Sequence, residues 1–183
     1  MAFVDLSRDT LVLKVLLAGP PASGKSERLT ELGARGEGVR TFGSRLLAET
    51  SYTVVQLDSA STRRAVEVEV YEWHGPEKVD IRARSLFTGL DGLVFIADAR
   101  ADRLVDTQGT LAFLRETSGR TRLARVPALL VRGRGDEGLL GLDALERKLE
   151  GVSWSLRFDG PLGDPGFFDA VLLLGEAMLA RVP

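Results

Sequence analysis

The chain has 183 residues, of which 44% are hydrophobic and 27% charged, and its net charge is −2. These values are typical of a soluble globular protein, and the length predicts a single domain over residues 1–183. So small a net charge gives no basic footprint for nucleic acid or for an anionic membrane. The chain has no cysteine, which excludes disulfides, thiolate metal sites and cysteine catalysis. With no apolar run long enough for a membrane span and no signal-peptide core, we expect a cytoplasmic protein.

The first predicted strand leads directly into a glycine-rich loop. An apolar run at 11–18 precedes Gly-Pro-Pro-Ala-Ser-Gly-Lys-Ser at 19–26, which matches the phosphate-binding pattern GxxxxGK[ST] at every position. Residues 26–32 then have the period of a helix, so loop N–H groups and a helix N-terminus would point at phosphate. Lys25 would reach the β- and γ-phosphates, and the Ser26 hydroxyl would ligate Mg²⁺. The predicted nucleotide-binding residues of this segment are Gly19, Ala22, Ser23, Gly24, Lys25, Ser26 and Glu27.

The rest of the chain alternates strands with helices. Residues 1–10 are predicted to be an edge extension or a flexible leader, and residues 41–52 an irregular polar loop. Strands are predicted at 11–18, 53–57, 65–71, 93–97, 128–131 and 152–158. Helices are predicted at 26–32, 100–117, 139–150 and, with the clearest apolar period, 167–182. The second and third strands would form an antiparallel hairpin. The order predicts an α/β fold with a six-stranded, mostly parallel sheet, one antiparallel strand and helices on both faces.

Three segments resemble one family of nucleotide-binding proteins. Residues 90–104, Leu-Asp-Gly-Leu-Val-Phe-Ile-Ala-Asp-Ala-Arg-Ala-Asp-Arg-Leu, resemble the fourth-strand segment of Arf-like GTPases and, more closely, of the bacterial MglA-type polarity and gliding GTPases. Residues 14–20 and 71–76 are similar to the same proteins. The resemblance implies a Ras-like P-loop domain that binds GTP or GDP with Mg²⁺ and acts as a molecular switch. It also implies effectors and a roadblock (LC7-type, MglB-like) regulator, recruited by loops near 41–53 and 75–89.

The catalytic segment departs from the family. Glu72-Trp73-His74-Gly75-Pro76 stands where small GTPases have Asp-x-x-Gly followed by a water-orienting Gln. Gly75 matches and would donate its N–H to the γ-phosphate, and Glu72 could hold Mg²⁺ through water. Pro76 replaces the Gln and cannot orient a nucleophile. The remaining candidates for catalysis are His74 and Glu77, with a turn or packing role as the alternative for His74.

The segments that would read the base and sense the γ-phosphate are also altered. Residues 133–136, Gly-Arg-Gly-Asp, stand where the family has Asn-Lys-x-Asp. Asp136 could accept from both guanine N–H donors, and the Arg134 stem could lie over the base. The Asn is absent, so we expect weakened guanine binding that Gly133→Asn would tighten; the alternative is a polar glycine turn. The Mg²⁺-sensing threonine would be Thr50 or Thr53.

Three functions follow from these features. The first is an MglA- or Ras-like switch with weak or partner-dependent GTP hydrolysis. The second is a pseudo-GTPase, an interaction scaffold that does not cycle. The third is a P-loop small-molecule kinase or ATPase, in which Asp98 after an apolar strand would hold the metal, although the chain has no inserted segment long enough for a lid.

Overall fold

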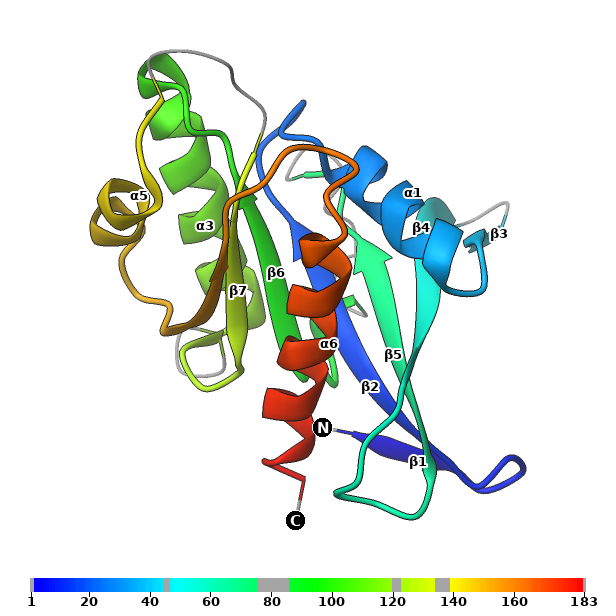
Figure 1. The fold of residues 1–183 in the computed structure, drawn as a ribbon. Coiled ribbons are helices and arrows are strands. Elements are labelled where there is room, and N and C mark those ends of the chain that lie inside the picture. The colour runs from blue at the N-terminus through cyan, green and yellow to red at the C-terminus, as the bar shows by residue number, and fades with distance from the viewer. Residues whose placement is uncertain (1, 45–46, 76–85, 120–122, 134–138, 183) are drawn as a thin grey trace.

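The computed structural model describes residues 2–44, 47–75, 86–119, 123–133 and 139–182. These residues form one mixed sheet of eight strands in the order β3-β4-β5-β2-β6-β7-β8, with β1 paired to β2 (Figure 1). The strands are β1 (Phe3–Asp5), β2 (Thr10–Ala18), β3 (Val39–Ser44), β4 (Leu47–Leu57), β5 (Ala65–Glu72), β6 (Gly92–Ala97), β7 (Ala128–Arg132) and β8 (Trp154–Phe158). The helices are α1 (Lys25–Arg35), the short 3-10 helix η2 (Ala101–Arg103), α3 (Leu104–Ser118), α5 (Leu142–Lys148) and α6 (Gly166–Leu179).

Strand β2 lies in the interior of the sheet because nearly all of its residues are apolar. It pairs in parallel with β5 on one side and β6 on the other, and eight of its nine residues are buried. Every residue of β6 and all but the last of β7 are buried as well. The carboxyl ends of these parallel strands meet at one edge of the sheet, which is where ligands bind in open α/β folds.

Helices cover both faces of the sheet, as Figure 1 shows. Leu32 of α1 and Leu174 of α6 belong to one apolar cluster, together with Val68 of β5. Leu114 of α3 and Leu145 of α5 belong to a second cluster on the opposite face. The predicted α/β class, with a mostly parallel sheet between two layers of helices, is therefore confirmed.

The predicted number of strands is wrong, because the sheet has eight strands and not six. Residues 41–52 were predicted as an irregular loop, but residues 41–44 belong to β3 and residues 47–52 to β4, and the two strands pair antiparallel at the sheet edge. Of the two predictions for residues 1–10, the edge extension is correct, because Phe3–Asp5 pairs with β2. Strands β1 and β4 both run opposite to their neighbours, so the sheet has two such strands where one was predicted.

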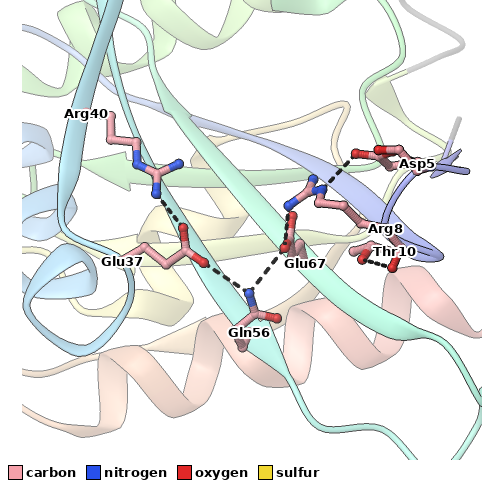
Figure 2. A network of polar contacts seen from close by, with 8 residues as sticks. Asp5, Arg8, Thr10, Glu37, Arg40, Gln56 and Glu67 are labelled. Atoms are coloured by element: carbon pink, nitrogen blue, oxygen red, sulfur yellow. Dashed lines mark hydrogen bonds and ion pairs between the residues drawn. The ribbon is translucent and has the colours of Figure 1, made fainter.

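A chain of polar contacts crosses the outer strands (Figure 2). The Gln56 amide nitrogen of β4 lies 3.3 Å from a carboxylate oxygen of Glu37 and 3.3 Å from one of Glu67. Each carboxylate also pairs with an arginine: Glu37 with Arg40 at 2.6 Å, and Glu67 with Arg8 at 2.9 Å. These polar contacts thereby connect the α1–β3 turn, strands β3 to β5 and the turn between β1 and β2.

Candidate functional site

The glycine-rich loop connects the end of β2 with the first residue of α1, as the sequence predicts. Gly24 has φ 98° and ψ 16°, a left-handed conformation that glycine adopts without strain, and it caps α1. Ala22 also has a positive φ, of 60°. The Ser23 hydroxyl is buried and has no hydrogen-bond partner among the described residues. Consecutive turns of this kind direct main-chain N–H groups into a concave site for an anion.

Lys25 lies inside the loop. Its ammonium donates to the carbonyl oxygens of Gly19, at 3.0 Å, and Pro20, at 2.7 Å. Burial lowers the pKa of Lys25, while the carboxylates of Glu72 and Glu27 act in the opposite direction. Both bonds go to neutral main-chain acceptors, and an anionic phosphate oxygen would attract the ammonium more strongly because donor and acceptor would then carry opposite charges.

Ser26 and Glu72 meet across the loop. The Ser26 hydroxyl donates to a Glu72 carboxylate oxygen at 2.6 Å, and Glu72, at the end of β5, is only 2% exposed. His74 Nδ1 lies 3.5 Å from the same oxygen, with its side chain 38% exposed. Gly75 follows in a buried position. The structure therefore brings together the predicted metal ligands Ser26 and Glu72, and places the candidate base His74 beside them.

Trp73 fixes this segment to the sheet. Its backbone N–H donates to the Leu17 carbonyl at 2.9 Å, and its buried ring stacks on Phe113 with centroids 5.7 Å apart. A large apolar residue between Glu72 and His74 is a sequence signal for such an anchor, although no role was predicted for Trp73.

The threonines lie on strand β4. The Thr53 hydroxyl is fully buried and donates to the Gly38 carbonyl at 2.8 Å, so it is engaged on the α1–β3 side of the strand. Thr50 is also buried, and its backbone pairs with Phe42. Of the other predicted site residues, Glu77, Arg134 and Asp136 lie outside the described residues.

Asp98, at the end of β6, is engaged by an arginine. Its carboxylate, 2% exposed, accepts from Arg100 Nε at 3.0 Å and from Nη2 at 2.6 Å. Burial alone would raise the pKa of Asp98, but the hydrogen bonds from Arg100 outweigh it and lower the pKa. In this arrangement the acidic partner of Ser26 is Glu72, whereas Asp98 is paired with Arg100.

A cleft of about 1060 Å³ opens beside the loop. It is lined by Ala22 and Ser23 of the loop, by Gly133 after β7 and by residues 159–162. Clefts at the carboxyl ends of parallel strands are the usual ligand sites of such sheets. A base attached to a phosphate group in the loop would therefore have room here.

Gly133 has no space for a side chain. Its N–H donates to the Ala97 carbonyl at 2.7 Å, and an added Cβ would lie 2.7 Å from that carbonyl oxygen and 2.8 Å from the Ser23 carbonyl oxygen. Real Cβ atoms essentially never approach backbone oxygens within 3.0 Å. The expectation that Gly133→Asn would tighten binding is therefore wrong, because the new side chain would push the phosphate loop away from β6.

Two arginines beside the cleft, Arg132 and Arg28, were not predicted as site residues. Arg132 pairs with Asp159 at 2.6 Å, and Arg28 reaches the Gly160 carbonyl at 2.6 Å. Arg28 and Glu31 are three residues apart in the sequence, a helical spacing that indicates an ion pair between them.

Comparison of the sequence with protein-family models and with curated proteins gives no match in either set. Across the described ranges, the structure has no helix with the length and apolar character of a membrane span. The same ranges contain no group of three or more histidine, cysteine, aspartate or glutamate residues that could hold a metal ion by themselves.

Proposed function

We propose that this chain is a guanine-nucleotide-binding, MglA- or Ras-like molecular switch of the cytoplasm, with weak or partner-dependent GTP hydrolysis. The observation that carries the proposal is the arrangement at the start of α1. There Lys25 lies inside a phosphate-type loop, and the next residue, Ser26, contacts the buried carboxylate of Glu72. A cation for phosphate and two candidate oxygen ligands for a metal thus lie together where α1 begins and β5 ends.

The oxygen donors fit Mg²⁺. This ion prefers oxygen ligands, and it is commonly bound by one or two carboxylates together with the phosphates of a substrate. Ser26 and Glu72 would hold it in this chain, with Thr50 or Thr53 as the candidate further ligand. The ion would neutralise phosphate charge, while Lys25 and the loop N–H groups would orient the phosphates.

The guanine preference and the partners rest on the family resemblance. Asp136 and Arg134 would face the base, and Gly75 would contact the γ-phosphate. The loops near 41–53 and 75–89 would recruit effectors and a roadblock-type, MglB-like regulator. Slow hydrolysis follows from Pro76, which has no side-chain donor or acceptor for a water molecule.

The nucleotide carried by the purified protein tests the proposal. Heat denaturation followed by chromatography should release GDP or GTP, and Lys25→Ala should abolish binding of a fluorescent guanine nucleotide. The control is Lys148→Ala, which removes an exposed lysine of α5 and should bind like wild type. Adenine nucleotide in the released fraction would support the kinase or ATPase instead. Tight binding by Lys25→Ala would refute the phosphate-loop assignment.

A second candidate is the pseudo-GTPase scaffold. It is favoured by two internal contacts: Lys25 donates to two loop carbonyls, and Ser26 donates to Glu72. Such a loop keeps its shape without phosphate. A purified protein that is folded, carries no nucleotide and binds none when titrated would establish this second function.

A further inference from the structure

Arg28 is a buried arginine on α1, one turn after Lys25. It is 3% exposed, and its guanidinium carbon lies 5.3 Å and 4.8 Å from the ring centroids of Phe158 and Phe167. Arginine is rarely buried, because its charge must be paired and its N–H groups satisfied. Here one amino group donates to Glu31 at 2.9 Å and another to the Gly160 carbonyl at 2.6 Å. The buried guanidinium of Arg28 therefore attaches the loop that contains Gly160 to α1.

The loop in question, residues 159–163, is held at three points. Arg28 holds the Gly160 carbonyl, and the Glu31 carboxylate accepts a hydrogen bond from the Gly163 N–H. On the other side, Asp159 pairs with Arg132 of β7 at 2.6 Å. Two attachments therefore lead to α1 and one to the sheet.

This loop forms one wall of the cleft beside the phosphate loop. Gly160 and Leu162 line the cleft, with Ser23 and Gly133 among its other lining residues. Because α1 begins at Lys25, the helix that would hold the phosphates also carries the residues that hold this wall. Gly133 cannot carry a bridging side chain, and among the described residues Arg28 and Glu31 connect α1 to this wall of the cleft.

We propose that Arg28 and Glu31 form a clamp on residues 159–163, and that Arg28 is a positioning residue for the base of a bound nucleoside diphosphate or triphosphate. The clamp sets the distance between the phosphate loop and the cleft wall, and thereby the affinity and preference for the base. The inference rests on the proposed function, since it assumes that a nucleotide occupies the cleft.

Calorimetry with GDP, ADP and inorganic pyrophosphate tests the role of Arg28. Arg28→Met keeps an apolar stem against the two rings but removes the donors. It should weaken GDP binding by about tenfold and lower the GDP-to-ADP preference, while pyrophosphate binding stays within about twofold of wild type. The control Arg64→Met removes a surface ion pair with Asp9 and should bind all three like wild type. Equal weakening of GDP and pyrophosphate would show a general structural role and overturn the proposal, as would no change.

Hydrogen exchange in the ligand-free protein tests the clamp independently of any nucleotide. Glu31→Ala removes the acceptor of the Gly163 N–H, so this amide should exchange at least about tenfold faster. Glu31 is partly exposed, so this variant serves if Arg28→Met does not fold. Unchanged exchange at Gly163 would refute the clamp. A wild-type protein that binds neither GDP nor ADP would refute the proposed function and the base-positioning role, whereas the exchange result would still decide whether the clamp exists.

Discussion

Gly133→Ala is the substitution whose effect the structure defines most closely. The new methyl group would lie 2.7 Å from the Ala97 carbonyl oxygen and 2.8 Å from the Ser23 carbonyl oxygen. Both obstacles are backbone atoms, one on a central strand and one in the phosphate loop, so neither can rotate away. The loop must therefore move relative to β6 and β7.

The expected cost follows from this overlap. Forcing an extra methyl group into a filled space costs about 1–3 kcal/mol of unfolding free energy. For a chain of this length, each kcal/mol lowers Tm by roughly 2–4 °C. Displacement of Ser23 also disturbs the phosphate loop, so GDP should bind about tenfold more weakly, equivalent to about 1.4 kcal/mol.

The same substitution elsewhere in the chain gives a matched control. Gly109 lies within α3, and apart from its chain neighbours and the adjacent helix backbone no atom of the described residues is within 4 Å of a Cβ added there. Gly109→Ala should raise the unfolding free energy by about 0.5–1 kcal/mol, because alanine has the higher helix propensity. Urea denaturation and GDP calorimetry on both variants measure the difference. A Gly133→Ala protein as stable as wild type, with the same GDP affinity, would show that the loop does not pack on β7 as described.

Three further outcomes are expected. Arg100→Ala should lower the unfolding free energy at pH 7, because it leaves the Asp98 carboxylate buried without its half-exposed partner. Since the folded-state pKa of Asp98 is lowered, the stability from this pair is present above about pH 4 and is lost as the pH falls through the folded pKa. Urea denaturation from pH 7 to pH 2 should therefore show a shallower decline in unfolding free energy for the variant than for wild type. Ser26→Ala should remove the effect of Mg²⁺ on GDP affinity, which titrations with and without EDTA would reveal; a retained effect would exclude Ser26 as a ligand. Single-turnover hydrolysis should not exceed about 10⁻⁴ s⁻¹, because Pro76 cannot orient water; a rate near 1 s⁻¹ without a partner would mean that another residue does so.

The central parts of the fold could be predicted because their signals are local. The apolar residues of β2 and the glycine pattern after it specify a strand, a loop and a helix within residues 10–35. The outer hairpin could not be predicted in the same way. The sequence of residues 41–52 contains many polar residues and has no apolar alternation that would distinguish it from a loop.

The candidate site divides along the same line. Lys25 and Ser26 follow from the motif, and Glu72 from the family resemblance. The contact between Arg28 and Gly160 joins positions 132 residues apart, and no short-range pattern encodes it. The tight approach of Gly133 to Ala97 likewise depends on how the loop packs on the sheet. The missing side chain at Gly133 is a loss when the residues are compared with the family motif, whereas the close packing of Gly133 against Ala97 and Ser23 requires a glycine.

The polar contacts of Gln56 also restrict the register in which β4 can pair with its neighbours. Side chains alternate between the two faces of a strand, so a one-residue slip of β4 would bring Val55, now fully buried opposite Val68, to the position of Gln56 beside the carboxylates. Only a displacement by an even number of residues would keep the apolar face of β4 inward, and it would still separate Gln56 from Glu37 and Glu67. Apolar contacts thus fix the strand register at the centre of the sheet, and the polar contacts of Gln56 with Glu37 and Glu67 fix it at the outer edge.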